Sequence, residues 1–178
     1  MRSSLVLTVI GPDRPGLVEL IASTVAAHGG NWERSRMAHL AGQFAGILNV
    51  TLPEARIGEL RHALEGLSVQ GLRVASVTTA PLQREPLRML QLELTGNDRE
   101  GIVREVARAL AARGVNVEEL DTRHESAPEA GGALFHARAL LHVPAQLDIA
   151  DLRKTLEDIA DDLMVDVSLL PAKDEDQR

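Results

Sequence analysis

The sequence predicts an α+β protein of two tandem domains, each with the order strand, helix, strand, strand, helix, strand. The first observation is a duplication: residues 5–33 match residues 90–118 at a shift of 85, with 13 identities in 29 positions. The second is that each copy opens with alternating apolar residues, typical of a half-buried strand, and continues with apolar residues at helical spacing. The third is turn chemistry, glycine and proline, between these patterns. A duplication this long indicates two domains rather than short solenoid repeats.

The duplication also sets the expected boundaries. The identical positions in the first copy are Leu5, Leu7, Gly11, Asp13, Arg14, Gly16, Val18, Ala22, Ala26, Ala27, Gly29, Asn31 and Glu33. After a longer loop in the second copy, HESAPEAGG, the shift becomes 91 and then 92, which pairs Phe44 with Phe135 and Leu60 with Leu152. We expect a first domain at 1–80, a linker at 81–86, a second domain at 87–171 and an acidic disordered tail at 172–178.

The elements of the first copy follow in order. SLVLTVI alternates and predicts a strand, whereas the apolar residues from Leu17 to Val25 fall on one face of a helix. Asp13 is the expected N-cap of that helix, since a short carboxylate side chain suits this position. NWERSRMAHLA and QFAGILNVTLP then predict a hairpin around Gly42.

The remaining elements complete the fold. EARIGELRHALEGL predicts a second helix and LRVASVT a last strand. Gly46, Leu48, Val50 and Leu52 share one face of their strand, so that face is expected to lie under the helices. Two right-handed strand–helix–strand crossovers in about 80 residues favour an antiparallel sheet with both helices on one face. Each domain is therefore expected to be a ferredoxin-like plait.

Composition excludes several classes of function. The chain has 178 residues, a net charge of −7 and no cysteine, which excludes disulfides, thiol nucleophiles and cysteine zinc sites. Residues 87–178 alone sum to −8, a balance that disfavours nucleic-acid binding. No apolar run approaches the roughly 20 residues of a membrane span, and the expected location is the cytoplasm.

The strand-to-helix loop GPDRPG is the candidate binding site. It leads into a helix N-terminus, where unpaired backbone N–H groups and the helix dipole favour an anion such as a carboxylate. Glycine lets a ligand approach the backbone, and an asparagine amide at position 31 can both donate and accept. The alternative is that the glycines only make turns and Asp13 only caps the helix.

Two segments carry a family resemblance. GPDRPGLV and GGNWERSRMAHLAGQFAGILNV resemble the first module of ACT-domain proteins, and this pattern is similar to that of the glycine cleavage system transcriptional repressors. The resemblance covers nearly the whole chain as two ACT modules. It implies regulatory βαββαβ units that pair side by side and bind amino acids at the interface.

Site residues follow from this resemblance, position by position. In the first copy it implies Gly11, Pro12, Asp13, Arg14, Pro15, Gly16 and Asn31 as ligand-binding residues, and in the second copy Gly96, Asp98, Arg99, Gly101 and Asn116. Leu17 joins the first set because its backbone N–H lies at the expected start of the helix. Asn97 and Glu100 replace the two loop prolines in the second copy. The first site is therefore the stronger candidate.

The function that the resemblance implies is non-enzymatic regulation. The chain is expected to bind a small, glycine-like amino acid, to need no cofactor or metal, and to form a homodimer. Because the sequence predicts no helix-turn-helix segment, regulation of transcription is expected through a DNA-binding partner protein. Direct binding of nucleic acid or membrane is not expected.

Two alternatives stay open. In the first, the chain is a structural interaction module that binds no ligand. In the second, it is an acylphosphatase-like enzyme in which Arg14 binds phosphate and Asn31 orients a water molecule. An RNA-recognition role is disfavoured, because the only aromatic residues are Trp32, Phe44 and Phe135. His136 and His142 lie six residues apart, roughly 20 Å along a strand at about 3.3 Å per residue, too far apart for one metal ion.

Overall fold

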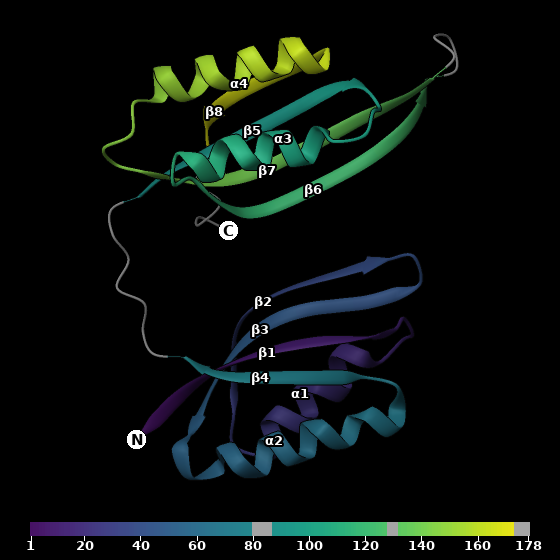
Figure 1. Cartoon of the computed structure of the whole chain (residues 1–178). Coiled ribbons are helices and arrows are strands. Elements are labelled where there is room, and N and C mark those ends of the chain that lie inside the picture. Colours follow the sequence, from purple (N-terminus) through teal and green to yellow (C-terminus); the bar gives the residue numbers. More distant parts are fainter. Residues whose placement is uncertain (80–86, 128–131, 173–178) are drawn as a thin grey trace. The chain divides into compact units, whose positions relative to one another are not determined.

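The chain divides into two compact units, Met1–Leu82 and Gln83–Arg178, in a computed structural model that describes residues 1–79, 87–127 and 132–172. The predicted linker at 81–86 and residues 173–178 of the predicted tail lie outside the described residues. Each unit is a four-stranded antiparallel sheet with two helices on one face (Figure 1). The predicted α+β class and the ferredoxin-like βαββαβ order are confirmed.

The first unit forms its sheet in the order β2-β3-β1-β4. Its elements are β1 (Arg2–Pro12), α1 (Leu17–Ala27), β2 (Asn31–Leu40), β3 (Gln43–Pro53), α2 (Ile57–Gly66) and β4 (Arg73–Thr79), with short 3-10 turns η1 (Glu54–Arg56) and η2 (Leu67–Gln70) at either end of α2. The hairpin predicted around Gly42 is confirmed: β2 and β3 are joined by Ala41 and Gly42, which both have positive φ.

The second unit repeats this order as β6-β7-β5-β8. Its elements are β5 (Leu87–Asn97), α3 (Ile102–Ala112), β6 (Asn116–Ala127), β7 (Gly132–Pro144), α4 (Ile149–Leu163) and β8 (Val165–Pro171). A local bulge interrupts pairing near the start of the second strand in both units, between Trp32 and Arg34 and between Val117 and Glu119. The duplication therefore extends to backbone irregularities.

Each unit has its own apolar core between sheet and helices. Leu48, Val50 and Leu52 are almost fully buried, which confirms the predicted inner face of β3. Phe44 and Phe135 are buried at equivalent places in the two cores, as the pairing of these residues predicts. Burial of alternate strand residues against two helices supplies the main stabilising free energy of each unit.

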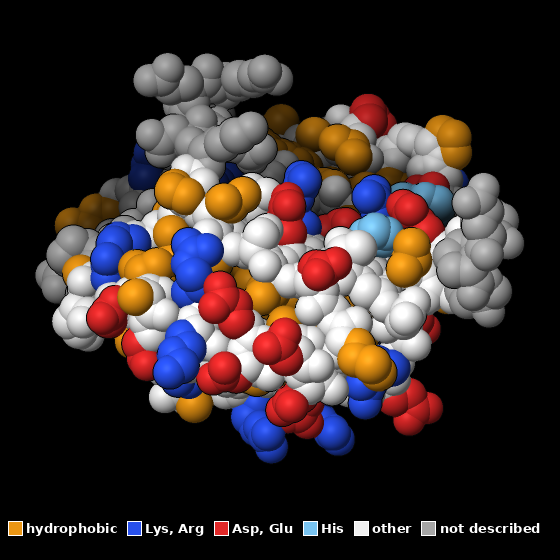
Figure 2. All heavy atoms as spheres, turned by 90° about the horizontal axis from the view of Figure 1, so that it is seen from above, with side chains coloured by type: hydrophobic (Ala, Val, Ile, Leu, Met, Phe, Trp, Pro, Cys, Tyr) orange, Lys and Arg blue, Asp and Glu red, His pale blue; other side chains and the backbone are white. Residues whose placement is uncertain are grey.

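Charged side chains occupy the outer surfaces. Acidic and basic side chains are interspersed over the face of the molecule in Figure 2. On α3, Glu105 forms ion pairs with Arg104 at 3.0 Å and with Arg108 at 2.6 Å. Among the described residues, no helix is long and apolar enough to cross a membrane.

Candidate functional site

The loops after β1 and β5 have the same backbone geometry. Gly16 and Gly101 are the N-cap residues of α1 and α3, with φ of 92° and 96°, in the left-handed region that favours glycine. Their carbonyl oxygens accept the first helical hydrogen bonds, from Leu20 at 2.9 Å and Glu105 at 3.0 Å. No side chain caps either helix. The expected cap at Asp13 is therefore wrong, because the chain enters the helix three residues later, through Gly16.

Asp13 and Asp98 instead lie beside the tip of the neighbouring hairpin. The backbone N–H of Asp13 donates to the Gly42 carbonyl at 2.9 Å, and its carboxylate lies 3.7 Å from His39 Nε2. In the second unit the carboxylate of Asp98 lies 3.3 Å from His124 Nδ1. The sequence analysis did not include the two histidines, although they match at the same shift of 85.

Each loop arginine donates hydrogen bonds to the end of the other helical segment of its unit. Arg14 Nη2 donates to the Gln70 carbonyl at 3.3 Å, at the end of η2. Arg99 Nη1 donates to the carbonyls of Asp162 and Leu163 at 3.3 Å, at the end of α4. Both guanidinium groups thus bind the carboxyl end of the second helical segment of their own unit.

A hollow of about 540 Å³ opens beside the first loop. It is lined by Asp13, Arg14, Gly16, Leu17, Val18, Glu19, Ala22 and Phe44. Two carboxylates, Asp13 and Glu19, meet the amino end of α1 here. This combination offers a negative group for an ammonium and backbone donors for a carboxylate within one depression.

Asn31 does not join this hollow within one unit. Asn31 pairs with Thr51, and Thr51 pairs with Ser4 near the start of β1. The loop begins at the other end of β1, after Pro12, eight residues or roughly 26 Å away at about 3.3 Å per residue. Asn31 and Arg14 therefore lie at opposite ends of one sheet, which also separates the two residues that an acylphosphatase-like mechanism would need together.

The asparagines instead form a second repeated feature, at the bulge that opens β2 and β6. Asn31 Nδ2 donates to Glu33 Oε1 at 2.8 Å, and Asn116 Nδ2 donates to Glu118 Oε1 at 2.9 Å. The Thr51 hydroxyl donates to the same Glu33 oxygen at 2.7 Å. These hydrogen bonds, with the charge of Arg2 nearby, lower the pKa of Glu33.

Glu33→Gln is expected to reduce stability at neutral pH, because the lowered pKa means that the charged carboxylate is favoured in the folded state. This stabilisation is present above the unfolded-state pKa of about 4.5 and is lost as pH falls through the lower folded value. Urea unfolding at pH 7 and pH 3 should show a larger loss of stability relative to wild type at pH 7 than at pH 3. Thr51→Val should weaken the same pH dependence; an equal difference at both pH values would contradict the hydrogen-bond explanation.

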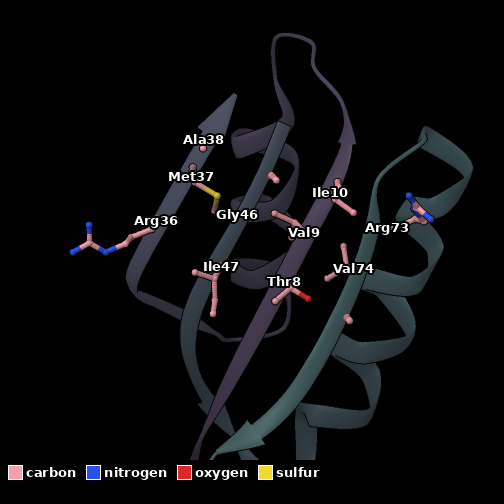
Figure 3. A pocket seen from close by; sticks show the side chains of 12 residues that line it. Thr8, Val9, Ile10, Arg36, Met37, Ala38, Gly46, Ile47, Arg73 and Val74 are labelled. Carbon is pink, nitrogen blue, oxygen red and sulfur yellow. The ribbon is translucent and has the colours of Figure 1, made fainter. Parts of the chain in front are cut away.

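The open face of the first sheet holds another hollow, of about 700 Å³ (Figure 3). Its floor is mostly apolar, with Ile10 and Ile47 about half exposed, and Arg36 and Arg73 extend from opposite edges of the sheet. In the second unit the pair equivalent to Thr8 and Ile47 is Glu93 and Arg138, which form an ion pair at 3.1 Å. The duplicated units therefore present different open faces.

Histidines in the second unit pair with carboxylates rather than with one another. His142 Nδ1 lies 2.8 Å from Glu118, and His136 Nε2 lies 3.6 Å from Glu125. Within the described parts of the chain, no group of three or more potential ligands could hold a metal ion.

Comparison with known proteins identifies the class to which this geometry belongs. The family model of the ACT domain matches residues 3–74, nearly all of the first unit. The second unit has the same topology, loop and bulge. The first unit is thus an ACT domain, and the second unit repeats its fold, so the chain carries two ACT-like βαββαβ units in tandem.

Several relatives match most of the chain. The glycine cleavage system transcriptional repressor of Escherichia coli (strain K12) is 27% identical over 166 residues, covering 89% of this chain and 85% of the relative. The solved structure of an unknown protein from Galdieria sulphuraria is 31% identical in sequence, with a TM-score of 0.88. The alignment covers 97% of this chain and 100% of the Galdieria chain. The UPF0237 protein MK1213 of Methanopyrus kandleri is 44% identical over 62 residues, 34% of this chain and 69% of the relative.

Proposed function

We propose that this chain is a non-enzymatic regulator that binds a small, glycine-like amino acid at the loop between β1 and α1. In this proposal the amino acid controls a contact with a DNA-binding protein, and through it transcription of the glycine cleavage system. The observation that carries the binding step is the hollow in which Asp13 meets the uncapped start of α1. The regulatory step is supported by the similarity to the E. coli repressor.

The proposed ligand pose uses two opposite charges. The ligand carboxylate lies at the backbone N–H groups of the first turn of α1, from Leu17 onward, where the helix dipole favours an anion. The ligand ammonium lies at the Asp13 carboxylate, which the structure leaves free of helix capping. Because Pro15 has no N–H, it offers the ligand no donor. Phe44 and Ala22 supply an apolar part of the lining, against which the rest of the ligand lies.

Asn31 enters this proposal only through a second molecule. The loop between β1 and α1 of the same molecule lies at the opposite end of the sheet from Asn31. The Asn31 amide therefore reaches a ligand at such a loop only when that loop belongs to a neighbouring copy of the chain. A homodimer that pairs ACT units side by side supplies such a neighbour. Strand β2, which begins at Asn31, lies at the edge of its sheet, where a second chain can add its own strand.

The second unit is the weaker candidate site. Asn97 and Glu100 replace two prolines of its loop, and Arg104 takes the place of Glu19. The Arg104 guanidinium lies within 3.5 Å of the position that a Cβ on Gly101 would occupy. A cation at the start of α3 repels a ligand ammonium, and we therefore propose that amino-acid binding depends mainly on the first unit.

Thermal unfolding with each common amino acid tests the proposal. Trp32 packs against the core of the first unit, so its fluorescence follows that unit. A ligand at about 100 times its dissociation constant should add roughly 2.7 kcal/mol and raise the midpoint by several degrees. Asp13→Asn should abolish the shift, whereas Glu65→Gln, an exposed change on α2, should keep it. If no amino acid raises the midpoint, the structural interaction module becomes the better interpretation.

A further inference from the structure

We infer that Arg14 and Arg99 are positioning residues: each fixes the strand-to-helix loop of its unit against the turn that leads into the last strand, and neither contacts the ligand. In the first unit this turn is Leu67–Leu72, which joins α2 to β4; in the second it is Asp162–Val165, where the end of α4 passes into β8. The inference rests on the proposed function only for its effect on ligand affinity.

The hydrogen bonds of the arginines join segments that are distant in sequence. Arg14 reaches a carbonyl 56 residues away, and Arg99 reaches two carbonyls 63 and 64 residues away. In both units the acceptors are among the last carbonyls before a residue with positive φ, Gly71 at 82° and Met164 at 55°. Carbonyls at a helix end lack intrahelical partners and carry the negative end of the dipole, so a guanidinium there is stabilising.

A close backbone approach repeats at the same place. A Cβ built on Gly11 would lie 2.6 Å from the Gly71 carbonyl oxygen. A Cβ built on Gly96 would lie 2.8 Å from Val165 Cα and 2.9 Å from the Met164 carbonyl oxygen. The end of the first strand therefore packs directly against this turn in both units, and the arginine three residues later donates to carbonyls at the end of the helical segment that leads into it.

The two turns differ in sequence, yet both arginines reach them. The first unit ends its helical segment with a 3-10 turn and Gly71, whereas the second runs α4 directly to Met164. The loops also differ, with Pro12 and Pro15 in one and Asn97 and Glu100 in the other. Asp, Arg and the N-cap glycine are common to both loops. Both arginines bind a helix end of their own unit, although the loops and the turns around them differ in sequence. This repeated contact indicates that the arginine orients the loop.

Amide hydrogen exchange of the ligand-free full chain tests this assignment. The N–H groups of Gly71 and Leu72 donate to Ser68 at 2.9 Å and Leu67 at 3.2 Å, so their exchange reports opening of the turn. Arg14→Ala should speed exchange at Gly71, Leu72 and Asp13 roughly fivefold, the change that an average hydrogen bond produces. Arg14→Lys, which keeps a single cationic donor group, should restore part of the protection. Arg56→Ala, which removes an exposed ion pair with Glu59, should change none of these rates.

The outcomes separate positioning from ligand contact. Arg99→Ala should speed exchange of the Met164 amide, which donates to Asp161 at 3.2 Å, and leave Gly71 unchanged. With glycine as the probe, Arg14→Ala should weaken binding about tenfold and Arg14→Lys less. Lost glycine binding with unchanged exchange would overturn the inference and make Arg14 a ligand contact, and unchanged exchange with unchanged binding would overturn it as well. If glycine fails to bind wild type, the glycine form of the proposed function fails, while the exchange rates still decide the role of Arg14.

Discussion

Leu60→Ala is expected to lower the midpoint of the Trp32-monitored thermal transition by on the order of 10 °C or more. Leu60 lies on the inner face of α2 and is 0% exposed. Removing a fully buried leucine side chain costs about 2–5 kcal/mol, from lost burial plus the cavity that remains. Each kcal/mol shifts the midpoint of a domain of this size by roughly 4–8 °C.

Leu152→Ala is the matched control, because Leu152 occupies the equivalent position on α4 and is also 0% exposed. Leu152 belongs to the core of the second unit, whereas Trp32 packs against the core of the first. The control should leave the Trp32-monitored midpoint near wild type and lower a circular dichroism transition instead. An equal loss of the Trp32-monitored midpoint in both variants would show that the two units unfold as one cooperative body.

The sequence predicts these cores because burial follows a simple period. Alternation placed Leu48, Val50 and Leu52 on the inner face of β3, and helical spacing placed Leu17, Ile21 and Val25 on the inner face of α1; all six are buried. The second copy of the repeat shows the same apolar pattern and so supports the prediction independently. Fold and core thus depend on local periodicity, which a single sequence contains in full.

The site is less predictable because its contacts are not local. The hydrogen bond between Arg14 and Gln70 spans 56 residues, and no local pattern indicates it. Asn31 follows α1 directly in sequence, yet α1 runs back along the sheet, so Asn31 lies at the end opposite the loop. His39 is different: extending the repeat at the shift of 85 would have paired it with His124 and brought it into the candidate site.

The predicted N-cap at Asp13 is wrong because of the backbone conformation at Gly16. Asp13 has the preferred side chain for an N-cap, but Gly16 has a φ of 92°, which turns the chain into α1 without a side-chain cap. Glycine reaches this region at little cost, and a residue with a Cβ does not. The consequence for function is that the Asp13 carboxylate is left for His39 and, in the proposed function, for a ligand ammonium.

Gly11→Ala is the second variant with a large expected effect: a loss of about 1–3 kcal/mol, the usual cost of forcing an extra group into a packed site. Gly11 is buried, and its new methyl group would lie 2.6 Å from the backbone oxygen of Gly71 and 3.3 Å from Leu72 Cα. Neither atom belongs to a flexible side chain, so either β1 or the turn must move. The Trp32-monitored midpoint in thermal unfolding measures the loss.

Gly58→Ala provides a control of opposite sign. Gly58 lies in α2, and a Cβ there meets nothing within 4 Å. Alanine should therefore stabilise the first unit by roughly 0.5–1 kcal/mol, through its higher helix propensity. If Gly11→Ala were as stable as wild type, the strand end and the turn would have room to separate. The loop would then not be held by close packing, and Arg14 alone would have to fix its position, which makes the Gly11→Ala, Arg14→Ala double variant the decisive comparison.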